Sequence, residues 1–321
     1  MNKLYSFDFI RAVAIIMIVM CHYFQFSGLN TSLGGHMGGA GNCIFFVLSS
    51  LLFGLKWERS GKQSFKMDFF QKRFAKIATS LYPFLIVLIV AFILFDVKFR
   101  VVDAVLNFFF LGWVAKLPGN GHLWFLTVLM MCYVMFFLLS RYHGRILNRW
   151  WSWVMLGALA VTCLILVESR GLPGHAFITL YLTTLGFSHA GEILERVKQV
   201  PFRWMFLQFV IIVGTTHLLF LSFEVYCWCR PVAVLLNNLC GISLLFFLLK
   251  LEHKRELSVL TFLSGISFEL YLVHHGFCQG FFSVFQLTDN YFLMLVLLVI
   301  VSITCAYILK QIANSLKTIK I

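Results

Sequence analysis

Charged side chains are scarce in this sequence, and acidic side chains are the scarcest. Asp, Glu, Lys and Arg make up 12% of the 321 residues, which is about half the fraction found in soluble domains. Hydrophobic residues make up 60%, and the mean hydropathy is +0.89. The longest polar stretch, 56–76, is too short to form a soluble domain. We therefore predict an all-α, polytopic integral membrane protein.

Metal-binding and redox motifs are also absent from the sequence. The chain has nine cysteines, but no two of them form a C-x-x-C pair, and none has the Cys/His spacing typical of a metal site. Most of the cysteines lie in apolar runs, where a cysteine acts as a small apolar residue. We predict no metal and no bound cofactor.

Apolar runs predict about ten transmembrane helices in one bundle, with Gly, Pro and charged residues at their ends. The predicted helices span 7–27, 40–55, 78–96, 122–140, 151–168, 174–190, 204–222, 231–250, 257–275 and 291–311. The run at 101–115 is short and is interrupted by Asp103. We predict a re-entrant or interfacial helix there.

The net charge of +13 would suit a nucleic-acid-binding protein, but its distribution does not. With both termini in the cytoplasm, 20 of the 26 Lys and Arg residues fall on the cytoplasmic side and 5 on the other side. This asymmetry is typical of a multi-pass membrane protein. The remaining cation is Arg11. We predict no nucleic-acid partner.

Arg11 and His22 both lie inside the first apolar run. Ionisable side chains are costly in a bilayer, so they usually face a protein interior and have a function. Eleven residues separate the two, which places them within roughly 20° on one helical face and about 16 Å apart along the axis. We predict that both line a polar shaft between the helices. The alternatives are an interfacial Asp8–Arg11 ion pair and a His22 that only bonds a neighbouring helix.

Four further segments combine polar and aromatic residues beside apolar runs. They are 39–49, which includes Asn42-Cys43-Ile44-Phe45-Phe46-Val47-Leu48-Ser49; 69–77, which includes Lys72-Arg73-Phe74-Ala75-Lys76; His122-Leu123-Trp124-Phe125-Leu126; and Ser267-Phe268-Glu269-Leu270-Tyr271-Leu272-Val273-His274. With Asp8, Arg11 and His22, these segments resemble the motifs of the acyltransferase 3 family of integral membrane acyltransferases, in the same order. The resemblance covers essentially the whole chain. Two departures are Ser50, where the family usually has Gly, and Lys72 and Lys76, where it has Arg.

The resemblance implies one acyltransferase domain over 1–321 without an appended soluble domain. It implies a membrane-bound O-acyltransferase, transferring groups other than aminoacyl groups, in the bacterial inner membrane with both termini cytoplasmic. Acetyl-CoA, or another acyl-CoA, would be the co-substrate on the cytoplasmic side. A hydroxyl of a cell-surface or lipid-linked glycan would be the acceptor, as in polysaccharide O-acetylation.

His22 is the predicted general base toward the acceptor hydroxyl, or else a transient acyl carrier. Arg11 is predicted to orient the donor or to stabilise negative charge on the thioester oxygen. These two residues are the predicted catalytic pair.

Three basic residues at one end of the polar stretch, Lys72, Arg73 and Lys76, are predicted to bind the phosphates of the donor. The alternative for this stretch is a topology signal attracted to anionic membrane lipids.

Four further residues are predicted to line the cavity or to contact the acceptor: His122, Trp124, Tyr271 and His274. The alternatives are interfacial anchoring for Trp124 and ordinary packing for Tyr271 and His274. We expect the neighbouring His275 to face elsewhere, and Glu269 to need a polar partner.

Two other functions fit parts of the sequence. Intramembrane Arg, His and Glu also suit a proton-coupled transporter or flippase for a glycan precursor. A catalytically silent scaffold is the third alternative. The absence of internal repeats and the order of the motifs favour the acyltransferase.

Overall fold

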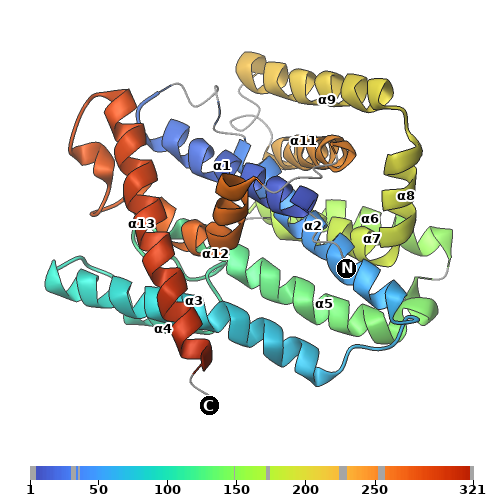
Figure 1. The fold of residues 1–321 in the computed structure, drawn as a ribbon, viewed down its shortest axis with the longest axis horizontal. Helices are drawn as coiled ribbons and strands as arrows, with labels where there is room; N and C mark the ends of the chain where they lie inside the picture. The colour runs from blue at the N-terminus through green and yellow to red at the C-terminus, as the bar shows by residue number, and fades with distance from the viewer. Residues whose placement is uncertain are drawn as a thin grey trace.

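The fold is entirely helical in the part of the chain that the structure describes. This computed structural model describes residues 5–29, 34, 37–147, 149–170, 174–223, 230–251 and 257–318. Figure 1 shows the arrangement of the helices. They are α1 (Tyr5–Phe26), α2 (Met37–Arg59), α3 (Met67–Leu94), α4 (Val101–Phe108), α5 (Trp124–Ile146), α6 (Trp150–Glu168), α7 (His175–Ser188), α8 (Ala190–Gln199), α9 (Phe202–Phe223), α11 (Arg230–Lys250), α12 (Ser258–Cys278) and α13 (Tyr291–Thr318), with short 3-10 turns η2 (Gly121–Leu123) and η3 (Val284–Gln286).

Each of the ten predicted helices coincides with an observed one, but eight of the described helices are long and apolar enough to cross a membrane. These eight are α1, α2, α3, α5 with η2, α6, α9, α11 and α13. They make the protein a multi-pass membrane protein. The other two predicted spans, 174–190 and 257–275, correspond to α7 and α12, which are not among these eight. Helix α7 has 14 residues and reaches about 21 Å, less than the hydrocarbon thickness. Helix α12 is mostly buried and contains Glu269 and two histidines.

Two helices extend well beyond their predicted ends. Helix α3 begins at Met67, so the second half of the polar stretch, 67–76, is helical and does not form a loop. Helix α13 continues to Thr318. Polar helical turns add no apolar signal, so the sequence did not predict these extensions. The extensions carry basic side chains toward the interior of the bundle. The short helix expected near 101–115 is present as α4, where Asn107 Nδ2 donates to the carbonyls of Asp103 and Ala115.

Close packing of α1 against α2 and α12 sets the position of Arg11 and His22 (Figure 1). Gly41 on α2 lies against α1, and a Cβ atom there would come within 2.8 Å of the Ala14 carbonyl oxygen. Glycine therefore allows the two backbones to approach closely. The face of α1 that bears Arg11 and His22 is directed into the bundle as a result.

Ser50 lies at a close contact between α2 and α7. It is fully buried, and its hydroxyl donates to the Val47 carbonyl at 2.7 Å. Gly186 on α7 faces it so closely that a Cβ atom at Gly186 would overlap Ser50 Oγ. The serine at this position is thus matched by a glycine on the neighbouring helix.

Gly186→Ala is therefore expected to lower the melting temperature of the purified protein, because overpacking a buried contact costs about 1–3 kcal/mol. Adding Ser50→Gly should restore part of the loss, since it removes the overlapping oxygen. Thermal unfolding of both single variants and the double variant measures the coupling. Strictly additive effects would show that the two residues do not compete for this space.

Candidate functional site

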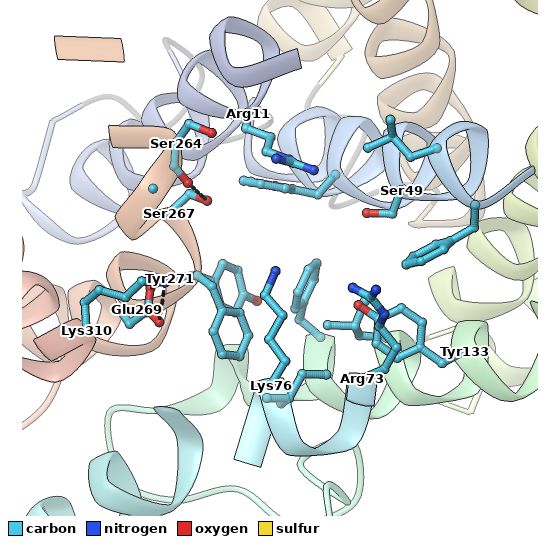
Figure 2. Close-up of a pocket in the computed structure, with 18 of the residues that line it drawn as sticks. Arg11, Ser49, Arg73, Lys76, Tyr133, Ser264, Ser267, Glu269, Tyr271 and Lys310 are labelled. Atoms are coloured by element: carbon cyan, nitrogen blue, oxygen red, sulfur yellow. Dashed lines mark hydrogen bonds and ion pairs between the residues drawn. The ribbon is translucent and has the colours of Figure 1, made fainter. Parts of the chain in front are cut away.

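A cavity of about 320 Å³ opens between α1, α2, α3, α5, α12 and α13 (Figure 2). Among the described residues, its lining includes six cationic side chains and one carboxylate, Glu269. The six cations are Arg11, Lys56, Arg73, Lys76, Lys310 and Lys317. Such an excess of positive charge in a concave, partly enclosed site favours an anionic ligand.

Arg11 projects into this cavity from α1 (Figure 2). Its guanidinium lies 3.7 Å from the carboxylate of Asp8, and its side chain remains 38% exposed. Asp8 also accepts a hydrogen bond of 2.8 Å from Ser264 on α12. The predicted Asp8–Arg11 pair therefore exists, but its geometry is loose and leaves most of the Arg11 donors directed toward the cavity.

Arg73 enters the cavity from α3, on the side opposite Arg11 (Figure 2). Its guanidinium lies over the ring of Phe53, 4.9 Å from the ring centre. Its Nε atom is buried, and no hydrogen-bond partner for it occurs in the described part of the chain. A buried donor without a partner is costly. An anion bound in the cavity would satisfy it.

The other two predicted donor-binding residues, Lys76 and Lys72, lie in different places. Lys76 lines the cavity and extends into it in Figure 2. Lys72 does not belong to the described lining of this cavity. It forms an exposed ion pair of 2.7 Å with Asp68, one turn earlier on α3, and borders a neighbouring hollow of about 250 Å³ that shares Lys56 and Arg73. Exposed pairs of this kind are weak, so Lys72 is a peripheral cation.

Glu269 has the polar partners that its burial requires. It is 1% exposed, and its Oε1 accepts hydrogen bonds from Ser80 at 2.8 Å and from Lys310 at 3.2 Å. Lys310 lies on α13, just before the end of the helix predicted for 291–311. These contacts place a neutralised ion pair in the cavity wall and leave the other five cations uncompensated by Glu269.

Four histidines form a second cluster next to the cavity. His22 on α1 lies with its Nδ1 atom 2.8 Å from Nε2 of His274 on α12. The ring of His275 is 4.5 Å from that of His22 and stacks on that of His122 at 4.6 Å. The expectation that His275 faces elsewhere was wrong: its side chain is 5% exposed and is a member of this cluster.

The hydrogen bonds of the cluster assign the ring protons. His274 Nδ1 lies 2.9 Å from the Leu270 carbonyl oxygen, which can only accept, so Nδ1 donates. In a neutral ring, His274 Nε2 is then the acceptor, and His22 Nδ1 must donate to it. This assignment leaves the lone pair of His22 on Nε2, to which none of the described residues hydrogen-bonds. An imidazole nitrogen of this kind can take a proton or attack a carbonyl carbon.

Tyr271 lies between the cavity and the histidine cluster. Its ring lines the cavity (Figure 2) and packs against Phe125 at 4.5 Å and His122 at 5.2 Å. Its hydroxyl donates to the His122 carbonyl at 2.8 Å. His22 does not belong to the described lining of the cavity. The structure thus places Arg11 and His22 in adjacent compartments, where the sequence predicted one shared shaft.

Trp124, like Lys72, is a predicted site residue that belongs neither to the described lining of the cavity nor to the histidine cluster. Its ring packs edge-on against His175 of α7, with centroids 3.9 Å apart. The preceding η2 turn brings His122 into the cluster, whereas Trp124 begins α5 and points toward α7. Sequence reasoning also missed Tyr133 and Lys310 as cavity residues. Tyr133 is one aromatic residue in an apolar helix and gave no signal.

Comparison with known proteins is consistent with this fold and site. The family model described as an acyltransferase domain matches residues 4–311. The chain therefore belongs to the acyltransferase 3 family, and its activity at the coarse level is acyl transfer. A search of curated proteins gave no match. A search of solved structures gave none either.

Proposed function

We propose that this acyltransferase moves an acyl group, in the simplest case acetyl, from acyl-CoA to a hydroxyl of a cell-surface or lipid-linked glycan. The observation that supports it most is a cavity with six cations and one carboxylate beside His22, whose Nδ1 atom lies 2.8 Å from His274 Nε2. Coenzyme A is a polyanion, and its phosphates would interact with Arg73 and Lys76. The excess of basic residues on one side of the predicted topology supports cytoplasmic termini and donor entry from the cytoplasm of a bacterial cell.

The proposed reaction breaks the thioester C–S bond and forms an ester. The acceptor oxygen attacks the thioester carbonyl carbon while His22 Nε2 takes the hydroxyl proton. The sulfur of the departing CoA then receives a proton. Alternatively, His22 Nε2 attacks the carbonyl first and expels the CoA thiolate; the acceptor hydroxyl then takes the acyl group from Nε2, and its proton goes to the thiolate. On either route the pantetheine arm must pass Tyr271 and Phe125 to bring the thioester to His22.

Arg11 has a more restricted role in this arrangement than the sequence suggested. It is about 16 Å from His22 along α1, as the rise per residue of a helix requires. An arginine side chain does not reach across that distance to an oxygen developing at His22. The position of Arg11 on the wall of the cavity instead supports the orientation of the donor, with its charge directed at the CoA moiety.

Transfer of radiolabelled acetyl from acetyl-CoA to surface glycan tests the proposed function. Membranes that contain the protein should move label into glycan, and alkali should release the label as acetate because the bond is an ester. A flippase or transporter would move unmodified saccharide and leave the glycan unlabelled. Equal labelling with and without the protein would refute the proposal.

Arg73→Met is expected to raise the KM for acetyl-CoA by about 10–100-fold, because a hydrogen bond to a charged group is worth about 1.5–3 kcal/mol. Lys72→Met, which removes a cation already paired with Asp68, should change it by less than about threefold. Initial rates at varied acetyl-CoA concentration measure both. Because Arg73 Nε has no hydrogen-bond partner among the described residues, the variant should lower the melting temperature only by the small contribution of the contact with Phe53. Similar KM values for the two variants would place the phosphates elsewhere.

A further inference from the structure

A second cavity, also of about 320 Å³, lies between α3, α12 and α13. Its walls come from 83–91 on α3, from 273–277 on α12 and from 305–312 on α13, together with Phe282 and Asn120. The lining is apolar apart from Asn120 and the weakly polar Cys305. In Figure 1, α13 crosses α3 with α12 beside both. We call this cavity the α3–α13 groove.

The groove opens toward the membrane lipids. Val87 on α3 is 65% exposed and Ile308 on α13 is 53% exposed, and both belong to helices able to span a bilayer. Apolar side chains on the outer faces of such helices meet hydrocarbon chains. A peptide would bring unpaired backbone groups into this setting at a large cost, whereas a lipid chain brings none.

One polar atom in the groove has no hydrogen-bond partner among the described residues. Asn120 is 2% exposed, and its Nδ2 donates to the Pro118 carbonyl at 2.9 Å. Its Oδ1 is buried, and nothing in the described chain donates to it. An acceptor left unsatisfied in an apolar site is costly. The groove therefore combines a hydrocarbon-lined wall with one site for a hydrogen-bond donor.

The polar end of the groove is next to the histidine cluster. On α12, Val273 and Gly276 face the groove, while the intervening His274 and His275 belong to the cluster. The carbonyl of Gly119, which precedes Asn120, accepts a hydrogen bond of 2.7 Å from His275 Nδ1. A hydroxyl bound at Asn120 would thus lie next to Gly119, whose carbonyl holds His275 in the cluster.

We propose that the α3–α13 groove binds the hydrocarbon chain of a lipid-linked saccharide acceptor, and that Asn120 Oδ1 accepts a hydrogen bond from a hydroxyl of the adjoining sugar. This inference rests on the proposed transfer to a glycan. The described lining of the groove shares no residue with the cationic cavity. Donor and acceptor would therefore approach the histidine cluster from different sides, which is what a reaction between a soluble cofactor and a membrane lipid requires.

Photo-crosslinking of the whole protein in lipid nanodiscs tests this site. One probe is dodecyl glucoside with a diazirine in its alkyl chain, and the other is the same diazirine chain without the sugar. Peptides from α3, α12 and α13 should be labelled by both. A Cβ at Gly276 would lie 3.6 Å from Asn120 Oδ1, so Gly276→Leu should project into the groove without disturbing the backbone.

Gly276→Leu is expected to reduce labelling by both probes about tenfold or more, because a leucine side chain fills the space of several methylenes. Asn120→Ala should reduce labelling by the glucoside alone, by about fivefold to tenfold. Gly214→Leu on α9, where a Cβ meets nothing within 4 Å, is the matched control and should change neither. Ala91→Trp provides a second obstruction if the Gly276 variant unfolds.

Two results would overturn the inference. Labelling of α6 and α9 as strong as that of the groove would show that any bilayer-exposed surface takes the probe. If Asn120→Ala changes the labelling by the two probes to the same extent, the sugar does not contact Asn120 and only lipid tails occupy the groove.

An activity assay separates this inference from the proposed function. Wild-type protein is given labelled acetyl-CoA and either a lipid-linked saccharide from the membrane or the same saccharide released from its lipid. Gly276→Leu should raise the KM for the lipid-linked acceptor about tenfold relative to the KM for the released saccharide. If wild type acetylates neither acceptor, the proposed function fails while the labelling result stands. If it acetylates both and the ratio does not change, the groove is not the acceptor site.

Discussion

Replacing His22 with alanine is expected to lower the rate of acetyl transfer by about 10²–10⁴-fold, the usual contribution of a positioned general base. The KM for acetyl-CoA should change little, since the described residues that line the cationic cavity do not include His22. The rate is measured with labelled acetyl-CoA and excess acceptor. His189→Ala, which removes an exposed histidine paired with Glu192, is the matched control and should stay within about twofold of wild type.

The same variant distinguishes the two proposed roles of His22. Wild-type protein is incubated with labelled acetyl-CoA without acceptor and then denatured. Label retained on the protein, and absent from His22→Ala, indicates an acyl carrier. A protein without label, together with the loss of activity in the variant, indicates a general base. Unchanged transfer by His22→Ala would exclude both roles and remove the histidine cluster from the mechanism.

The sequence was sufficient to predict the all-helical fold and where each long helix would lie. Apolar runs interrupted by Gly, Pro and charge determine the membrane-embedded part of a helix, because the bilayer requires both length and apolarity. The same signal could not predict that α3 starts at Met67 or that α13 reaches Thr318. Those turns are polar, and their helical state depends on neighbours. Lys317 therefore lay outside the helix predicted for 291–311, although it lines the cavity.

Helical periodicity correctly put Arg11 and His22 on one face of α1, but it could not show what lies between them. Tyr271 and Phe125 come from α12 and α5, far away in the sequence, and their packed rings separate the cavity from the histidine cluster. A shared face is a local property of one helix. A shared compartment depends on residues from other helices, so only the structure could distinguish one shaft from two neighbouring sites.

His275 shows a related limit of reasoning from one helix at a time. Adjacent residues on a helix point about 100° apart, so His274 and His275 were expected to have different surroundings. Helix α12, however, contacts several elements. His274 meets His22 on α1, and His275 reaches both the edge of His22 and the ring of His122 from the η2 turn. Both histidines therefore join one cluster from different directions.

The second large effect is expected at His274, which we propose acts by fixing the ring proton of His22. Its Nε2 atom accepts the hydrogen bond from His22 Nδ1 while its own Nδ1 donates to Leu270. His274→Asn keeps an amide donor near the Leu270 carbonyl but is too short to offer His22 an acceptor. We expect the rate to fall by about 10²–10⁴-fold, in line with the loss of a tautomer-fixing partner, without a change in the KM for acetyl-CoA.

His274→Gln is the matched variant, because its longer amide places an oxygen near the position of Nε2. It should retain activity within about tenfold of wild type, since the hydrogen bond from His22 Nδ1 is preserved. Nitrogen NMR of protein labelled in histidine reports the His22 tautomer directly: the proton should stay on Nδ1 in the glutamine variant and redistribute in the asparagine variant. Equal losses in both variants would indicate packing alone. A selective rescue by glutamine, with the His22 proton kept on Nδ1, indicates an acceptor at this position, because the added methylene determines whether the amide oxygen reaches His22.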